Sequence, residues 1–90
     1  MSCYLVTYDL IKKGQDYPKL HEILNNYDHI MLSESSYMVA SDKSQTQVFD
    51  SFKKSVDGND LLAVIKVTNN MTIQALSGTH EWLKDNLPKG

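Results

Sequence analysis

Apolar and polar residues follow the two-residue period of β-strands in four stretches of the chain. Residues 3–9 and residues 61–67 are apolar on both faces, with Lys66 as the exception. Strands that are covered on both sides show this pattern, so both stretches are predicted near the centre of a sheet. Residues 29–34 and 36–41 alternate more clearly and are predicted to form a hairpin.

Two segments between these strands have the longer period of an amphipathic helix. The first is predicted at residues 17–26, with Asp16 as its N-cap and Pro18 in its first turn. The second begins after Ser44, whose spacing from Gln47 is that of a capping box. It is expected to end at residues 57–59. The apolar stripes of the two helices comprise Tyr17, Leu20, Ile23, Leu24 and Tyr27, then Val48, Phe49, Phe52 and Val56.

The order of these elements is strand, helix, strand, strand, helix, strand. With right-handed crossovers it predicts an α+β, ferredoxin-like βαββαβ fold, in which four antiparallel strands carry both helices on one face. Residues 71–75 are predicted to form an additional C-terminal strand, and residues 80–86 a short helix with Thr79 as N-cap. A single domain is expected over residues 1–90, with a core at 2–67 and an extension at 68–90.

The second face of this sheet needs a cover, because two helices leave it bare and the first and fourth strands are apolar on both sides. The extension, a second copy packed sheet against sheet, or a strand that extends a partner's sheet would each provide one. A homodimer is predicted, because folding of a chain this short buries only about 60–65% of its unfolded surface. Tyr4, Tyr8 and Tyr37 lie off the helical stripes and are expected at such an interface.

Charge narrows the choice of partners. All nine basic residues are lysine, and the net charge is −2. Non-specific nucleic-acid binding depends on neutralised phosphates, and arginine is the best bidentate phosphate ligand, so neither feature favours a nucleic acid. Such a partner would depend on backbone amides and on a small set of lysines, namely Lys12, Lys13, Lys53 and Lys54.

The sequence also argues against a zinc site and against a membrane location. The histidines and Cys3 lack the spacing of a zinc site, and Cys3 is expected to be a small buried hydrophobic residue. No apolar run approaches the roughly 18 residues that span a bilayer, and the N-terminus has no basic stretch followed by an apolar one. A cytoplasmic protein without a membrane partner is therefore predicted.

A carboxylate, Asp9, ends the first strand. One carboxylate is a poor site for a hard cation, which takes several oxygen ligands. Two Asp9 side chains across a dimer axis would supply two ligands, and a metal held there would polarise a phosphodiester and activate water. The alternative is that Asp9 ends the strand, bonds to loop amides or caps the turn before Gly14, and otherwise contacts only water.

The stretch Ser2-Cys3-Tyr4-Leu5-Val6-Thr7-Tyr8-Asp9-Leu10 also carries a family resemblance, together with Glu34-Ser35-Ser36-Tyr37 and Asn59-Asp60. It resembles the small CRISPR-associated family-two proteins, and more closely the bacterial and phage relatives labelled "SinR family". The resemblance covers residues 2–67. It implies a homodimer of ferredoxin-like subunits in which Asp9 faces its symmetry mate. In some members this pair is proposed to hold a divalent metal for phosphodiester cleavage, while in others the dimer is a structural part of a spacer-integration complex.

Transferred to this chain, the resemblance makes Asp9 the candidate catalytic residue and the ligand of Mg2+ or Mn2+. The candidate substrate-binding residues are Tyr8, Lys12, Lys13, Ser35 and Ser36. Many members have arginines at the start of the first helix, where this chain has residues 15–18 without any. The predicted function is a non-catalytic or weakly catalytic dimeric module that acts through protein or nucleoprotein partners. The alternative is a metal-dependent endonuclease, which Asp9 favours.

Overall fold

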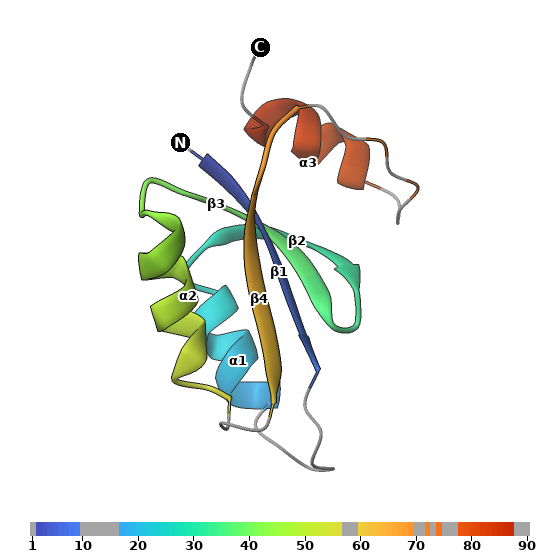
Figure 1. Cartoon of the computed structure of the whole chain (residues 1–90). Helices are drawn as coiled ribbons and strands as arrows, with labels where there is room; N and C mark the ends of the chain where they lie inside the picture. The colour runs from blue at the N-terminus through green and yellow to red at the C-terminus, as the bar shows by residue number, and fades with distance from the viewer. Residues whose placement is uncertain are drawn as a thin grey trace.

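The structure is a computed structural model that describes residues 2–9, 17–56, 60–69, 72, 74 and 78–87, apart from the side chains of Tyr17 and His80. Figure 1 shows its four strands and three helices. Their bounds are β1 Ser2–Asp9, α1 Tyr17–Leu24, β2 Asp28–Ser33, β3 Ser36–Ser41, α2 Gln45–Lys53, β4 Leu61–Val67 and α3 Thr79–Asn86.

The four strands form one antiparallel sheet in the order β2-β3-β1-β4. This is an α+β architecture, and its strand order is compatible with a ferredoxin-like fold. The prediction of a central position is confirmed for β1, which pairs with both β3 and β4. It is wrong for β4, which among the described strands lies at the edge of the sheet and pairs with β1 alone. Both faces of β4 are therefore apolar even though this strand lies at the edge of the sheet.

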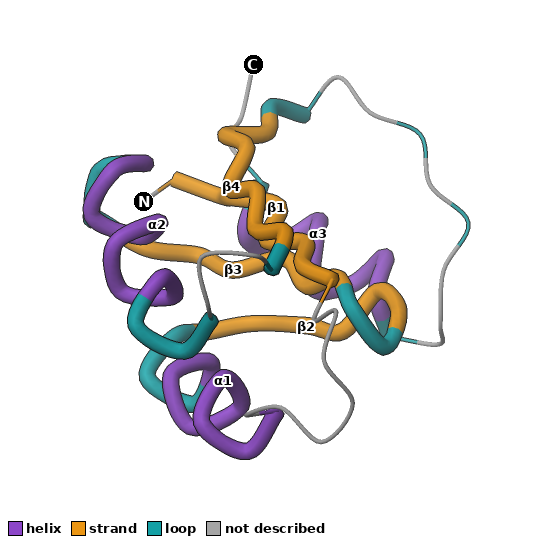
Figure 2. Tube along the Cα trace, turned by 60° about the horizontal axis from the view of Figure 1, so that its bottom comes forward, coloured by secondary structure: helices purple, strands orange, loops and turns teal. Residues whose placement is uncertain are grey.

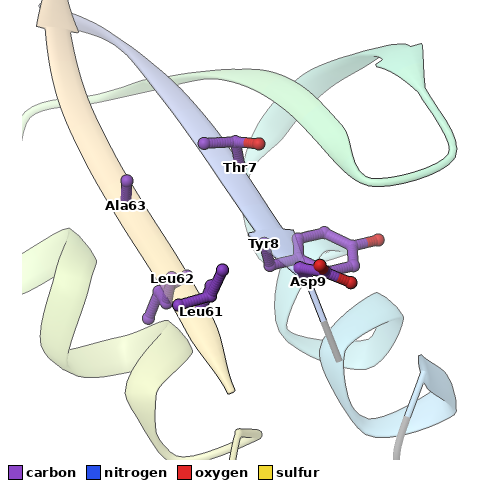
Figure 3. A pocket seen from close by; sticks show the side chains of 6 residues that line it. All are labelled: Thr7, Tyr8, Asp9, Leu61, Leu62 and Ala63. Atoms are coloured by element: carbon purple, nitrogen blue, oxygen red, sulfur yellow. The ribbon is translucent and has the colours of Figure 1, made fainter. Parts of the chain in front are cut away.

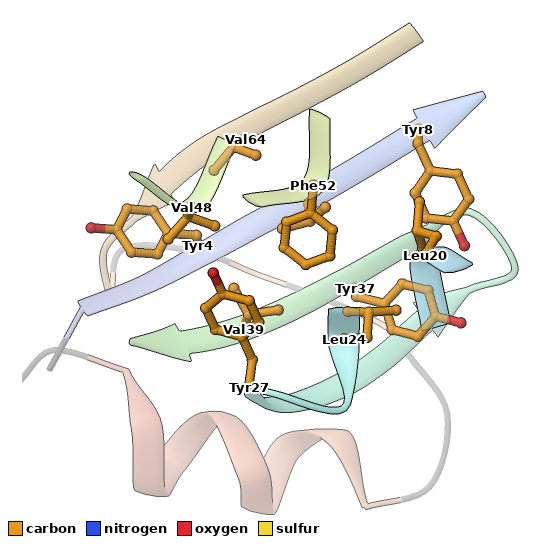
Figure 4. Close-up of a cluster of buried hydrophobic side chains, with 11 residues drawn as sticks. Tyr4, Tyr8, Leu20, Leu24, Tyr27, Tyr37, Val39, Val48, Phe52 and Val64 are labelled. Carbon is orange, nitrogen blue, oxygen red and sulfur yellow. The ribbon is translucent and has the colours of Figure 1, made fainter. Parts of the chain in front are cut away.

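Helices α1 and α2 lie on one face of the sheet, and the larger part of the core lies between them and the strands (Figure 4). The capping box that begins α2 is confirmed, because the Gln47 amide donates to the Ser44 hydroxyl and the Ser44 amide donates to the Gln47 side chain. The core cluster comprises Tyr4, Val6, Tyr8, Leu20, Leu24, Tyr27, Tyr37, Val39, Val48, Phe52 and Val64. Three tyrosines predicted at a dimer interface, Tyr4, Tyr8 and Tyr37, belong to this core, so that prediction is wrong.

Helix α1 ends at Leu24, two residues earlier than predicted. The Asn26 amide donates to the Ile23 carbonyl and the Tyr27 amide to the Leu24 carbonyl, so the chain leaves the helix through a tighter turn. Tyr27 nevertheless keeps its place in the core, where its ring stacks on Phe52 with centroids 5.5 Å apart.

Helix α3 packs on the opposite face of the sheet, over the end where β1 begins (Figures 1 and 2). Its Leu83 side chain is buried with Cys3 and Met38, and the indole of Trp82 donates a 3.0 Å hydrogen bond to the Asp28 carboxylate. The N-cap is Gly78 at φ 88°, a left-handed conformation that suits glycine, and the predicted N-cap Thr79 is a buried residue of the helix itself.

The predicted strand at residues 71–75 falls largely outside the described residues. Thr72 and Gln74 are described and belong to neither a helix nor a strand. Among the described helices, none is long and apolar enough to cross a membrane.

Candidate functional site

Helix α3 covers only part of its face of the sheet, and the candidate site is the part it leaves uncovered. Strand β1 turns Thr7 and Asp9 toward this face, and pairing in register places Ala63 beside Thr7 and Leu61 beside Asp9. Ile65 of β4 shares the same face two residues further along. We term these five residues, Thr7, Asp9, Leu61, Ala63 and Ile65, the open half.

The open half is an apolar surface with one carboxylate at its end. The side chain of Leu61 is 61% exposed and that of Ile65 is 50% exposed. A hollow of about 370 Å³ lies here, lined by Thr7, Tyr8, Asp9, Leu61, Leu62 and Ala63 (Figure 3). Leu61 and Ile65 flank Ala63 on one face of β4, and a contiguous exposed apolar patch indicates a contact site.

Asp9 is exposed at the last position of β1. Its neighbour Tyr8 points to the other face, where its ring is 3% exposed and stacks on Tyr37 at 6.3 Å. The Tyr8 hydroxyl donates a 3.0 Å hydrogen bond to the carbonyl of Glu34. Of these two candidate residues, the structure therefore presents the side chain of Asp9 at the open half and holds that of Tyr8 in the core.

The two candidate serines lie at the β2–β3 hairpin, next to the end of β1. The Ser35 carbonyl accepts hydrogen bonds from the Tyr8 amide at 2.9 Å and from the Thr7 hydroxyl at 3.3 Å. Ser36 pairs with Thr7 across the sheet, so Ser36, Thr7 and Asp9 share one face. Its hydroxyl lies 2.6 Å from that of Ser33, and the two share a hydrogen bond. The remaining candidates, Lys12 and Lys13, lie outside the described residues.

Within the described part of the chain, no three His, Cys, Asp or Glu side chains gather as a metal site would require. Asp9 is the carboxylate of the open half, and Thr7 and Ser36 add hydroxyl oxygens on the same face. A hard divalent cation takes about six or more oxygen ligands. A metal at Asp9 would therefore need a second carboxylate, which a second molecule packed on this face would bring.

Cys3 belongs to the opposite end of this face and offers no nucleophile at neutral pH. Burial raises the pKa of its thiol to about 11. A hydrogen bond from the Tyr4 backbone lowers this pKa, and the nearby Asp28 carboxylate raises it slightly further. Its side chain is 0% exposed beneath Leu83, as expected for a small buried hydrophobic residue.

Leu61 and Ile65 are the surface residues that the sequence analysis missed. The signal is present in the sequence, because β4 is apolar on both faces, but the same pattern also predicts a central strand. In an edge strand the same pattern indicates one face in the core and one face available for contact.

Comparison with known proteins supports the fold but identifies no family. No family model and no curated protein matches the chain. Among solved structures, the fold is similar to that of a hypothetical protein, TT1823, from Thermus thermophilus, with a TM-score of 0.63 and 18% sequence identity. The match covers 83% of this chain and 92% of that one. At this level of identity the similarity concerns the fold alone.

Proposed function

We propose that this protein is a ferredoxin-like homodimeric module, similar to the CRISPR-associated family-two proteins, that acts through protein or nucleoprotein partners without catalysing a reaction of its own. The observation that carries the proposal is the apolar surface of the open half. There Leu61 is 61% exposed and Ile65 is 50% exposed. In this proposal two copies pack with these surfaces together.

Face-to-face packing of the two sheets would bury this surface. Two stacked sheets lie about 10 Å apart, so the side chains of Leu61, Ala63 and Ile65 would interdigitate with those of the second copy. Asp9 stands at the end of the apolar strip, where its carboxylate keeps contact with water at the rim. Polar groups at the rim and apolar groups at the centre are the usual anatomy of a protein interface.

The charge of the molecule supports a partner other than bare nucleic acid. The chain carries 11 acidic against nine basic residues, none of them arginine. The one ionised group of the open half is a carboxylate, which repels phosphate. An affinity that depends on displaced counterions has little basis on this surface.

The alternative function, a metal-dependent endonuclease, is favoured by one observation. Asp9 is exposed and lines the hollow of the open half. If two copies instead pack with a two-fold axis close to Asp9, their Asp9 carboxylates would approach each other and supply two ligands to Mg2+ or Mn2+. A metal bound there would act as a Lewis acid on a phosphodiester and lower the pKa of a bound water.

A cleavage assay separates the two functions. Wild type, Asp9→Ala and a control variant, Asp50→Ala, which removes an exposed carboxylate from α2, are incubated with single-stranded RNA and double-stranded DNA, with and without Mn2+. We expect the same background in all three. Cleavage that needs Mn2+, persists in Asp50→Ala and is lost in Asp9→Ala would establish the endonuclease instead.

A further inference from the structure

A second pocket lies on the helix-covered side of the sheet, away from the open half. It has a volume of about 270 Å³ and is lined by His21 of α1, Met31 of β2, Glu34 of the hairpin turn and Tyr37 of β3. Met31 and Tyr37 are register partners and so share this face, whereas Ser36 pairs with Thr7 on the other. We term these four residues the hairpin pocket.

The aromatic wall of the hairpin pocket consists of the exposed His21 and of Tyr37, which is 6% exposed and is held from three sides. The Tyr37 ring lies parallel to Tyr8, and two imidazoles meet it edge-on, His21 at 6.1 Å and His29 at 6.0 Å. The His29 ring is itself oriented by a 2.9 Å contact between its Nδ1 and the Tyr27 carbonyl. Figure 4 shows Tyr37 at one end of the core cluster, with its hydroxyl directed away from Phe52. A wall fixed in this way loses little entropy when a ligand binds.

The pocket also contains the carboxylate of Glu34, for which the described part of the chain supplies no counter-ion. The backbone of Glu34 is anchored, because its carbonyl accepts the hydrogen bond of the Tyr8 hydroxyl. Its side chain is exposed, no described residue forms an ion pair or a hydrogen bond with it, and no described lysine lines the pocket. Beside it, Met31 is 41% exposed. One negative charge next to an apolar and aromatic wall is complementary to a cation on an apolar stem.

We propose that the hairpin pocket binds the side chain of an arginine from a partner protein. A guanidinium group is planar, weakly hydrated and able to stack on rings while it donates two parallel hydrogen bonds to a carboxylate. Its methylene groups would pack on Met31, whose flexible side chain adapts to such contacts. The pocket is slightly smaller than the roughly 300 Å³ at which small-molecule sites begin, which suits a single side chain.

The composition of the chain identifies the source of this arginine. All nine basic residues are lysine, so a second copy of the same chain has no guanidinium to offer. The occupant therefore comes from a different protein. The inference rests on the proposed function, a module that acts through protein partners, and it deepens that proposal by naming the chemistry of the partner's contact.

Nuclear magnetic resonance of the full-length, 15N-labelled protein tests the inference with N-acetyl-arginine amide as the probe. The matched probe is N-acetyl-citrulline amide, which has the same shape and no charge. We expect saturable shifts of the amide signals of His21, Met31, Glu34 and Tyr37 with the arginine probe and none with citrulline. Glu34→Gln, which preserves the size of the side chain, should weaken binding by about tenfold or more, since a charge-assisted pair is lost. The control Glu22→Gln, on the neighbouring α1, should leave binding unchanged.

Equal shifts with citrulline, equal binding by Glu34→Gln, or no response to the arginine probe would overturn the inference. Shifts of the same signals by guanosine monophosphate, without a response to arginine, would also overturn it and assign the pocket to a nucleobase. The open half lies on the opposite face, so an Ile65→Asp variant should bind the arginine probe as wild type does. The inference therefore fails separately from the proposed homodimer.

Discussion

Replacement of Ile65 by aspartate tests the central physical argument, that the open half is buried by a second copy. Ile65 lies at the end of the apolar strip away from Asp9 and is 50% exposed, so a carboxylate at this position remains hydrated in the single chain. In a sheet-on-sheet dimer the same carboxylate would lose its water without gaining a partner. The substitution should therefore weaken association much more than folding.

The magnitude follows from the exposed fractions. Full burial of a leucine or isoleucine side chain is worth about 1.5–3 kcal/mol, so the 61% of Leu61 and the 50% of Ile65 that are exposed correspond to about 1–2 and about 1 kcal/mol per copy. A symmetric dimer contains each residue twice. Loss of both Ile65 contacts removes about 2 kcal/mol or more, which raises the dissociation constant about 30-fold before the cost of desolvating two carboxylates is added.

Sedimentation equilibrium over a range of protein concentrations measures the effect directly. Wild type should approach twice the 10.2 kDa mass of one chain, and Ile65→Asp should remain near the single mass. Ile65→Thr keeps the β-branched shape that suits a strand and should give an intermediate constant. Thr46→Asp, on the exposed surface of α2, adds the same charge away from the open half and should dimerise as wild type does.

Two results would refute the reasoning. A wild-type mass of 10.2 kDa at every concentration would leave the apolar strip without a second copy to cover it. Equal dimerisation of wild type and Ile65→Asp, with circular dichroism showing both to be folded, would place the interface elsewhere on the molecule.

Two further predictions concern stability. The pKa of Cys3 is about 11 when folded and 9.0 in the reference state, so the folded chain holds this proton more tightly. The associated stability is complete below pH 9 and decreases as the pH rises from 9 toward 11, by about 1.4 kcal/mol per unit. Urea unfolding of wild type and Cys3→Ala at several pH values should show this difference, and a uniform offset would contradict it. Ser44→Ala should cost about 1 kcal/mol of unfolding free energy through loss of the capping box, and an unchanged urea midpoint would contradict that value.

Local signals predicted much of the fold. The bounds of β3 and β4 agree with the prediction because turn-forming residues and changes of hydrophobic period mark the ends of these segments. The start of α2 was predictable because both partners of its capping box, Ser44 and Gln47, lie within four residues of sequence. Interactions of this short range can be recognised in a single sequence.

Features that depend on distant contacts were not predicted. A tyrosine on a strand suits a core as well as an interface, and the choice for Tyr4 depends on α2, which begins 41 residues later at Gln45. Residue type favours Thr79 as the N-cap of α3, although Thr79 is buried in the fold and Gly78 has the backbone conformation that begins the helix. In each case tertiary packing overrode a correct local preference.

In the candidate site, too, one feature follows from local sequence and the others follow from distant contacts. Asp9 could be identified from its position alone, because alternation along β1 sends it to the face opposite Tyr8. Its neighbours could not, since Leu61 and Ser36 are placed by strand pairings that span 52 and 29 residues from Asp9 and Thr7. A shift of β4 by one residue would turn Leu61 and Ile65 toward the helices and remove the apolar strip altogether. The proposed interface is thus a property of this register, and the Ile65→Asp experiment tests the register together with the dimer.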